Sequence, residues 1–457
     1  MEIGSKYGFC TTIAQANYED LPDDVVRFVK YDLIDTIGVM LAAKTAPGIA
    51  ELIEIHSIWE TSKHSRIFNN SLRMSAPAAA MINSCMAHAL DFDDTLDFAG
   101  NIHIGASCIP AALAVSDYLN DVTGEELITS LCMGLETSCH LAVIAEVDRG
   151  WHRTSTFGIF GATATVSKLL KLKNDQIVNA LGIGLSYASG TRQCISDGVL
   201  TKRMQAGIAA QNAVYSAFFS QCGLTGAKDP FWGEYGFFPM YQPDAYNEAL
   251  DFKDFGTEYI LPKLSFKPFP AGRPTHKFIN VGIKISKWMQ ENKITFSSIK
   301  TIEIRCNKAT IERHESNSEP IRPPSNQIEA QFHVPFLLSA AVIHGKFGLL
   351  ELERIADKSI IHLSSICNWQ TDNSYYEGSG QLVIGLGQGE FHGFDFKAEE
   401  MTQAPDFVEN LIKEKFFECL NYSKEVNFNH ASELWDMLQE VECLNNVSAL
   451  TELMAKL

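Results

Sequence analysis

Four short segments of the chain combine a cationic side chain with a nearby glycine or proline and could carry out acid–base chemistry. They are His103-Ile104-Gly105, Trp151-His152-Arg153-Thr154, Thr201-Lys202-Arg203 through Gly207, and Lys267-Pro268-Phe269-Pro270 through His276. An imidazole exchanges protons near neutral pH, and lysine and arginine bind carboxylates. Each segment alone is more typical of a surface or structural site than of a catalyst. If the four converge, we expect them to form a socket for a di- or tricarboxylate.

The densest acidic segment, His88 to Asp97, has more than one interpretation. Asp93, Asp94 and Asp97 match the D-D-x-x-D pattern with which helical prenyl-diphosphate enzymes hold magnesium. The second metal motif of such enzymes is incomplete here, because Val178 replaces its serine. The simpler expectation is that these three aspartates cap helix ends in solvent. We therefore expect no metal site.

Nucleotide chemistry and serine hydrolysis lack sequence support. The glycines around Gly182 and Gly385 do not match a dinucleotide-binding loop, and the chain has neither a P-loop nor a nucleophile elbow. We expect no cofactor.

The net charge favours a local cationic pocket over a general cationic surface. The chain has 37 lysines and arginines against 55 aspartates and glutamates, which gives −18. Nucleic acids and anionic membranes bind surfaces with an excess of positive charge, so we expect neither as a partner.

The cysteines and the amino terminus predict a cytoplasmic protein. The 11 cysteines are scattered without a C-x-x-C pair, which argues against a disulfide framework and favours a reducing compartment. The first residues lack the features of a signal or transit peptide. The longest uncharged stretch, 176–191, is too short and too polar for a membrane-spanning helix, which needs ~20 apolar residues.

The elements that must position these groups are helices through the first 260 residues. The opening helix follows Pro22, with apolar residues every four positions from Val25 to Leu41. The same periodicity predicts helices at 77–88, 110–118, 125–144, 157–170, 176–189 and 204–222. Several of these are rich in alanine and glycine, which lets helix axes approach closely.

The pattern changes after Pro262. Alternating residues predict strands within 298–306 and 380–396, and helices are expected at 279–291 and 328–344, then at 407–420 and 431–441. We therefore predict a mainly α protein with two domains. A large all-helical domain, 1–264, is completed by C-terminal helices, 405–457, and a smaller α+β domain occupies 265–404.

The order and spacing of several segments resemble the MmgE/PrpD family. These are Leu21-Pro22 through Val39, His88 through Thr95, His103, Trp151 through Thr154, Thr201 through Gly207, Lys267 through Pro270, and Glu329-Ala330-Gln331-Phe332. The resemblance extends from Asp20 to the last helices. It implies a large all-helical domain, a smaller α+β domain, a homodimer, and a cofactor-free active site in the cleft between the domains.

The resemblance also implies roles for individual residues. It points to catalytic positions at Asp91, His103, His152, Lys202 and Lys267, and to substrate-binding positions at Thr95, Arg203, His276 and Phe336. Family members include 2-methylcitrate dehydratase, cis-aconitate decarboxylase and iminodisuccinate epimerase, which all make or discharge negative charge on a carbon next to a carboxylate. Such chemistry needs a positioned proton donor or acceptor and fixed cations. Crowding against the lysines would keep the histidines neutral, and Asp91 would orient one of these groups or cap a helix.

Three departures from the family pattern bear on the substrate. His103 is followed by Ile104-Gly105 where relatives usually carry Pro-Ser, Gln205 stands where many have His, and Phe336 stands where the decarboxylase and the dehydratase have a pocket Tyr. Without that phenolic donor, we expect poor activity on cis-aconitate and 2-methylcitrate.

The sequence thus predicts a cofactor-independent lyase, a decarboxylase or dehydratase, for a small di- or tricarboxylic acid. An epimerase or isomerase of a related acid is the alternative within the same chemistry. A catalytically silent member that serves as a binding or structural protein is the alternative from another class, and a filled cleft would favour it.

Overall fold

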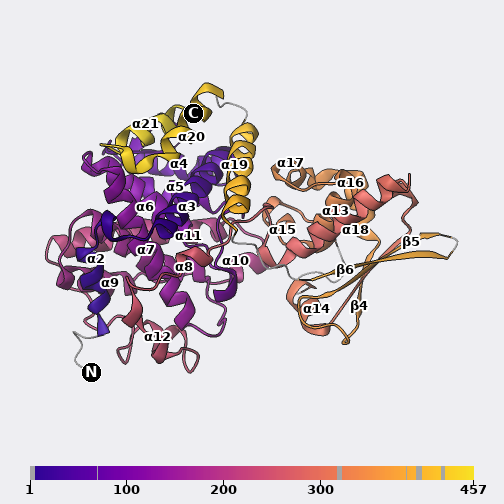
Figure 1. Cartoon of the computed structure of the whole chain (residues 1–457), viewed down its shortest axis with the longest axis horizontal. Coiled ribbons are helices and arrows are strands. Elements are labelled where there is room, and N and C mark those ends of the chain that lie inside the picture. Colours follow the sequence, from indigo (N-terminus) through magenta and orange to yellow (C-terminus); the bar gives the residue numbers. More distant parts are fainter. Residues whose placement is uncertain (1–5, 69, 316–321, 388, 398–403, 424–427) are drawn as a thin grey trace. The chain divides into compact units, whose positions relative to one another are not determined.

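The computed structural model describes residues 6–68, 70–315, 322–387, 389–397, 404–423 and 428–457 (Figure 1). Contacts divide the chain into two compact units. The first contains residues 1–193, 200–266 and 403–457, and the second contains 194–199 and 267–402. The main segment of the second unit begins two residues from the domain boundary predicted at 265, and the last helices belong to the first unit. Residues 194–199, predicted within the first domain, group with the second unit.

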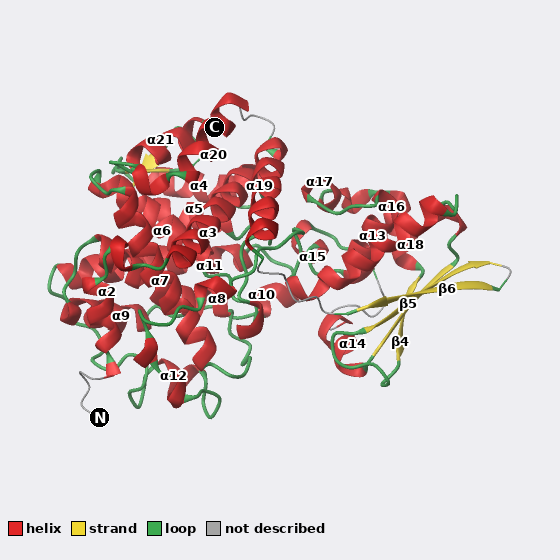
Figure 2. Ribbon diagram, in the orientation of Figure 1, coloured by secondary structure: helices red, strands yellow, loops and turns green. Residues whose placement is uncertain are grey.

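The first unit is built from helices (Figure 2). They are α2 (Gly8–Gln15), α3 (Asp23–Ala42), α4 (Ile49–Trp59), α5 (Ala76–Ala87), α6 (Gly105–Leu119), α7 (Gly124–Ile144), α8 (Arg153–Leu169), α9 (Asn174–Leu185), α11 (Thr201–Gln221), α12 (Phe237–Tyr241), α19 (Pro405–Tyr422), α20 (Phe428–Gln439) and α21 (Ser448–Lys456). The short α10 (Gln193–Ser196) crosses the division. A two-stranded antiparallel pair, β1 (Ser65–Arg66) with β2 (Arg73–Met74), was not predicted, because two-residue strands leave no alternating pattern.

Helix α6 begins earlier than the sequence predicted. Proline is typical of a helix start, and Pro110 was placed there, but it lies inside α6. The helix starts at Gly105 because the Asp94 side chain accepts hydrogen bonds from the N–H groups of Ile104 and Gly105. That distant carboxylate satisfies groups that would otherwise be unpaired in the core.

Small residues allow the central helices to pack closely, as their composition predicted. A Cβ atom at Gly134 of α7 would lie 1.7 Å from Thr165 Oγ1 of α8. A Cβ atom at Gly207 of α11 would lie 2.4 Å from Cys85 Sγ and 2.7 Å from the Met81 carbonyl oxygen, both on α5. Gly207 therefore lets the start of α11 lie against the end of α5.

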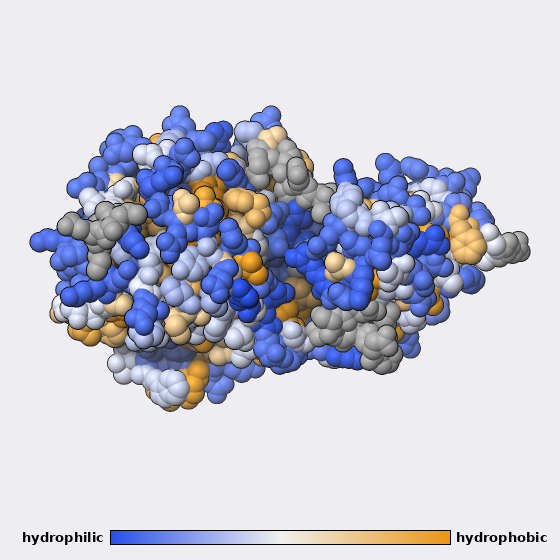
Figure 3. Space-filling view, turned by 90° about the horizontal axis from the view of Figure 1, so that it is seen from below, coloured by the Kyte–Doolittle hydropathy of each residue, from blue (hydrophilic) through white to orange (hydrophobic). Residues whose placement is uncertain are grey.

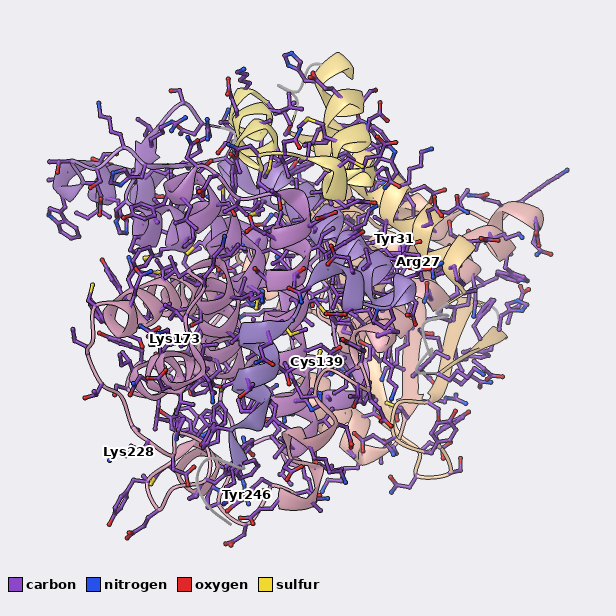
Figure 4. All side chains as sticks on the ribbon, turned by 60° about the vertical axis from the view of Figure 1, so that its left-hand side comes forward. Arg27, Tyr31, Cys139, Lys173, Lys228 and Tyr246 are labelled. Carbon is purple, nitrogen blue, oxygen red and sulfur yellow. The ribbon has the colours of Figure 1, made fainter. Side chains whose placement is uncertain are left out.

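Helix α7 is long and apolar enough to cross a membrane by length and composition, but 94% of its apolar window is buried inside the protein. It packs against α8 over most of its length. Cys139 of this helix lies deep among the side chains of the first unit (Figure 4).

The second unit holds a four-stranded sheet of order β4-β3-β5-β6. Strand β3 (Thr301–Cys306) is parallel to β4 (Cys367–Thr371) and antiparallel to β5 (Gly380–Gly387), which pairs with β6 (Glu390–Phe396). Strand β4 was missed because most of its residues are polar and exposed. The helices are α13 (His276–Glu291), α14 (Lys308–Glu315), α15 (Gln327–Ala330), α16 (Val334–His344), α17 (Leu349–Leu352) and α18 (Lys358–Ser365).

The single helix predicted at 328–344 is in fact two helices. Helix α15 ends at Ala330, and α16 begins at Val334 after His333, whose Nδ1 accepts a hydrogen bond from the N–H of Phe336 at 3.0 Å. Pro335 lies in the first turn of α16, where its missing N–H costs nothing.

The surface agrees with the composition. On the face drawn in Figure 3, hydrophilic residues predominate and hydrophobic ones are scattered. All 11 cysteines are free, and only Cys222 and Cys443 are exposed.

Replacing Gly207 with alanine is expected to lower the stability of the protein. The added methyl would collide with the α5 backbone, and such overpacking typically costs ~1–3 kcal/mol. Thermal unfolding of the two proteins measures the effect. The matched control is Gly8→Ala, where nothing lies within 4 Å of the new Cβ atom. Equal melting temperatures for Gly207→Ala and the wild type would contradict the close approach of α11 and α5.

Candidate active site

Four helix ends of the first unit bring imidazole and ammonium groups together. His88 directly follows α5, and His103 lies two residues before α6. His152 directly precedes α8, and Lys202 is the second residue of α11. All four side chains are almost fully buried. Because a helix N-terminus carries a partial positive charge, the starts of α6, α8 and α11 favour a negatively charged ligand.

His88 is the central residue of this group. Its Nδ1 lies 2.6 Å from Asp93 Oδ2, and its Nε2 lies 3.3 Å from His152 Nε2 and 3.2 Å from Lys202 Nζ. Because the carboxylate accepts a hydrogen bond, the proton of neutral His88 resides on Nδ1, and Nε2 is the acceptor. His88 and Asp93 were not predicted as site residues. Their position in one acidic segment with Asp91 is the signal that could have found them.

Asp91 orients Lys202. Its Oδ1 atom lies 3.0 Å from Lys202 Nζ, and both residues are buried. The backbone at Asp91 is left-handed, with φ of 51°. Such strained conformations of residues other than glycine are found preferentially at functional sites. Of the two roles expected for Asp91, orienting a lysine agrees with this ion pair.

His103 is fixed by a backbone carbonyl at its ring and by a threonine hydroxyl at its backbone N–H. Its Nδ1 donates a hydrogen bond to the carbonyl oxygen of Asp94, and its N–H donates to Thr154 Oγ1 at 3.3 Å. The carbonyl sets the proton of the neutral ring on Nδ1, which makes Nε2 the nitrogen that accepts a further proton.

The surroundings keep the central histidines neutral. Burial and the charge of Lys202 lower the pKa of His88, although Asp93 opposes this change. Burial, together with His88, Lys202 and His103, lowers the pKa of His152 well below its ordinary value. Neutral imidazoles at pH 7 can act as proton acceptors.

The acidic segment is inside the protein, so the expectation that Asp93 and Asp94 lie in solvent was wrong. Both are fully buried, whereas Asp97 is half-buried. Asp94 does cap α6, but from within the core. Burial and the charge of Asp93 raise the pKa of Asp94, and burial with Asp94 and Asp35 raises the pKa of Asp32.

A lysine from the C-terminal region braces this segment. Lys415 of α19 lies 2.7 Å from Asp35 Oδ1 of α3, donates a hydrogen bond to the carbonyl of Phe92, and lies 4.2 Å from the Phe92 ring centre. Helices α3 and α19 run side by side, with Arg27 and Tyr31 of α3 near α19 in Figure 4. The last helices therefore contribute a charge that the acidic segment needs.

Arg203 and Thr95 are buried at the site but hold its backbone. The Arg203 guanidinium donates to the carbonyls of Pro47 and Ala89 at 3.0 and 2.9 Å. The backbone of Thr95 pairs with that of Ser265. Both contacts position the acidic segment, and the substrate-binding roles expected for Arg203 and Thr95 stay predictions.

The remaining predicted residues belong to the second unit. Lys267 is its first residue after Phe266, fully buried and two positions beyond Ser265. His276 Nε2 lies 3.0 Å from the carbonyl oxygen of Ala271. Phe336 is buried in an apolar cluster and contacts the ring of Phe347 edge-on. Their roles toward a substrate stay predictions.

Two of the departures from the family pattern have a local cause. A Cβ atom at Gly105 would lie 2.6 Å from Asp32 Oδ1 and 2.7 Å from Thr36 Oγ1, so serine does not fit there. Gln205 donates to the Thr191 carbonyl at 3.1 Å, and its side chain opposes the lowering of the pKa of His152.

One set of ligand atoms could geometrically hold a cation. Asp91, Asp93 and His103 each offer an atom within 4.8 Å of the others. However, Lys202 and His88 already bind oxygens of the two aspartates, at 3.0 and 2.6 Å. A metal ion bound here would lie close to the Lys202 ammonium, and the expectation of a metal-free site stays a prediction.

Comparison with protein families gives two consecutive matches. The MmgE/PrpD N-terminal domain matches residues 8–249, and the MmgE/PrpD C-terminal domain matches residues 269–427.

The curated relatives are named as decarboxylases. The chain is 27% identical over 276 residues to the cis-aconitate decarboxylase-like protein oryM of Aspergillus oryzae, which covers 56% of this chain and 57% of that protein. It is 23% identical over 74% of its length to the cis-aconitate decarboxylase of Aspergillus terreus, of which 72% is covered. The human cis-aconitate decarboxylase is 26% identical over 61% of this chain and 59% of its own length.

The lowered pKa of His152 predicts how stability depends on pH. The folded protein keeps this ring neutral, whereas the unfolded chain takes up a proton below about pH 6.5, so stability falls as the pH drops below that value. In His152→Gln this contribution is absent, and the loss of stability between pH 7 and pH 5.5 is expected to be smaller. Urea unfolding at the two pH values measures it. The control is His362→Gln, which changes an exposed histidine. If His152→Gln lost as much stability between pH 7 and pH 5.5 as the wild type, His152 would not be a buried neutral histidine.

Proposed function

Because the chain belongs to the MmgE/PrpD family, we propose that it is a lyase, a decarboxylase or dehydratase, for a small di- or tricarboxylic acid. The observation that supports this proposal best is the buried contact of His88 with Asp93, His152 and Lys202. It combines neutral proton acceptors with a fixed cation. Chemistry at a carbon next to a carboxylate needs both.

Each side chain has a distinct part in the proposed reaction. Lys202 binds a substrate carboxylate and stabilises the charge that develops beside it, and Lys267 is proposed as a second carboxylate ligand. His103 or His152 removes or returns the proton. When His152 gains a proton, its Nε2–H can donate to His88 Nε2, while Asp93 stabilises the resulting charge through His88. Asp91 keeps Lys202 in place during this exchange.

The same groups suit an epimerase or isomerase of a related acid, because such an enzyme also moves a proton next to a carboxylate. A silent family member is less favoured, since His103, His152 and Lys202 are buried together rather than replaced. We also propose a cytoplasmic homodimer: the resemblance implies the dimer, and the free cysteines favour a reducing compartment.

An NMR assay in D₂O with a panel of acids is expected to show turnover without added metal or nucleotide. The panel contains cis-aconitate, because the relatives carry that name, together with trans-aconitate, 2-methylcitrate, citramalate-like acids and iminodisuccinate. Alkene formation, loss of CO₂ and simple deuterium exchange give different spectra, so the assay separates the lyase from the epimerase. No turnover with any acid, or turnover abolished by EDTA, would contradict the proposal.

Two variants of the central group test the assignment in the same assay. His88→Asn cannot pass on a proton and is expected to lower kcat on the order of 10²-fold. Lys202→Met is expected to raise KM and also to lower kcat, because the charge of Lys202 is proposed to stabilise the transition state. A charge that only helped to bind the substrate would change KM alone. Exposed His64→Asn is the matched control. Activity of His88→Asn equal to that control would remove His88 from the mechanism.

Phe336→Tyr is expected to increase any trace of activity on cis-aconitate or 2-methylcitrate. The ring shape is kept, and the new hydroxyl supplies the donor that the family pattern places there. If the ring instead only fills the apolar cluster, the hydroxyl lacks a partner and costs ~1–3 kcal/mol of stability. Kinetics and thermal unfolding of the one variant separate these cases. Efficient wild-type turnover of either acid, unimproved by tyrosine, would show that this hydroxyl is dispensable.

A further inference from the structure

The second unit contains a pocket of about 330 Å³ between one face of α13 and the paired ends of β5 and β6. From α13 it receives Lys277, Val281 and Lys284, which lie on one helical face because they are four and seven residues apart. Lys397, which follows β6, also lines it. The volume is at the lower end of the range for small-molecule sites.

Lys277 is the unusual member of this lining. Only 8% of the residue is exposed, and its Nζ lies 5.2 Å from the centre of the Phe278 ring. Among the residues that the structure describes, none supplies a carboxylate within ion-pair distance. Glu377, whose charge it senses, is paired with Arg313 at 3.4 Å. A lysine this deeply buried without an acidic partner is costly.

The charges of the lining favour an anion. Three lysines face one acid, Asp395, and that acid accepts a hydrogen bond from Gln381 at 2.9 Å. This local excess of positive charge occurs in a chain of net charge −18. Burial and the neighbouring Arg313 lower the pKa of Lys277 to about 8, and a bound anion would reverse that change.

The lining also offers an apolar surface. Val281 and buried Phe396 lie on its inner side, and Tyr375 and the exposed Tyr376 bring aromatic rings to it. We propose that this pocket binds a small oxyanion, a carboxylate or phosphate with an apolar portion, through Lys277, with Lys284 and Lys397 as further ligands.

Competitive acetylation of the full-length protein at pH 8, read by peptide mass mapping, tests this site directly. The probes are inorganic phosphate and succinate, each compared with chloride at equal ionic strength. We expect one or both to slow acetylation of Lys277 several-fold and to leave Lys287 unchanged, because Lys287 lies on the same helix but outside the pocket. Protection by phosphate alone or by succinate alone identifies which oxyanion fits. No protection by either, or equal protection of Lys287, would overturn the proposal.

Binding to variants gives an independent measurement. In calorimetry with the effective probe, Lys277→Met is expected to weaken binding about tenfold or more, whereas Lys287→Met keeps the wild-type affinity. Methionine preserves most of the length and the contact with Phe278. If Lys277→Met does not fold, the acetylation experiment on the wild type still decides. Equal affinity of the folded Lys277→Met and Lys287→Met proteins would also overturn the proposal.

Discussion

The first unit depends on the neutralisation of buried carboxylates. Asp35, Asp91, Asp93 and Asp94 are all almost completely removed from water. An unpaired charge in such a place costs several kcal/mol, so each aspartate must bind a cation, accept hydrogen bonds or hold a proton. The chain supplies all three solutions. The groups that compensate these carboxylates come from α6, α11 and the C-terminal α19, so the contacts join distant parts of the chain.

This arrangement also explains how the site can be both charged and ready for proton transfer. Lysine and aspartate charges are paired, while the imidazoles between them stay neutral because burial and adjacent cations oppose protonation. The starts of α6, α8 and α11 carry partial positive charges, which add to the positive potential of Lys202. These partial charges require no further charged side chain in the core. In the proposed reaction a substrate carboxylate would meet donors that are already oriented, which is the form of electrostatic stabilisation that contributes most to catalysis.

Particular residues show how far the sequence could be interpreted. His103, His152, Lys202 and Asp91 were found because each stands in a recognisable motif, and the structure brings them into one buried group. His88 was not predicted as a site residue, although it begins the acidic segment of the family pattern, because its contacts with His152 and Lys202 join residues far apart in the sequence. Arg203 was predicted to bind substrate; its guanidinium donates to two backbone carbonyls, and the substrate role stays a prediction. A charged residue in a motif does not reveal whether it faces a ligand or the main chain.

The sequence by itself determined the helical first region, the change to a mixed sheet after Pro262 and the family motifs, since these follow from periodicity and local residue order. Only the tertiary structure decided the partners of the charges. The pairs Asp91 with Lys202 and Asp35 with Lys415 join residues more than a hundred positions apart. Local sequence does not encode which distant charges pair, because such pairs form only when separate helices pack together, as α3 does against α19.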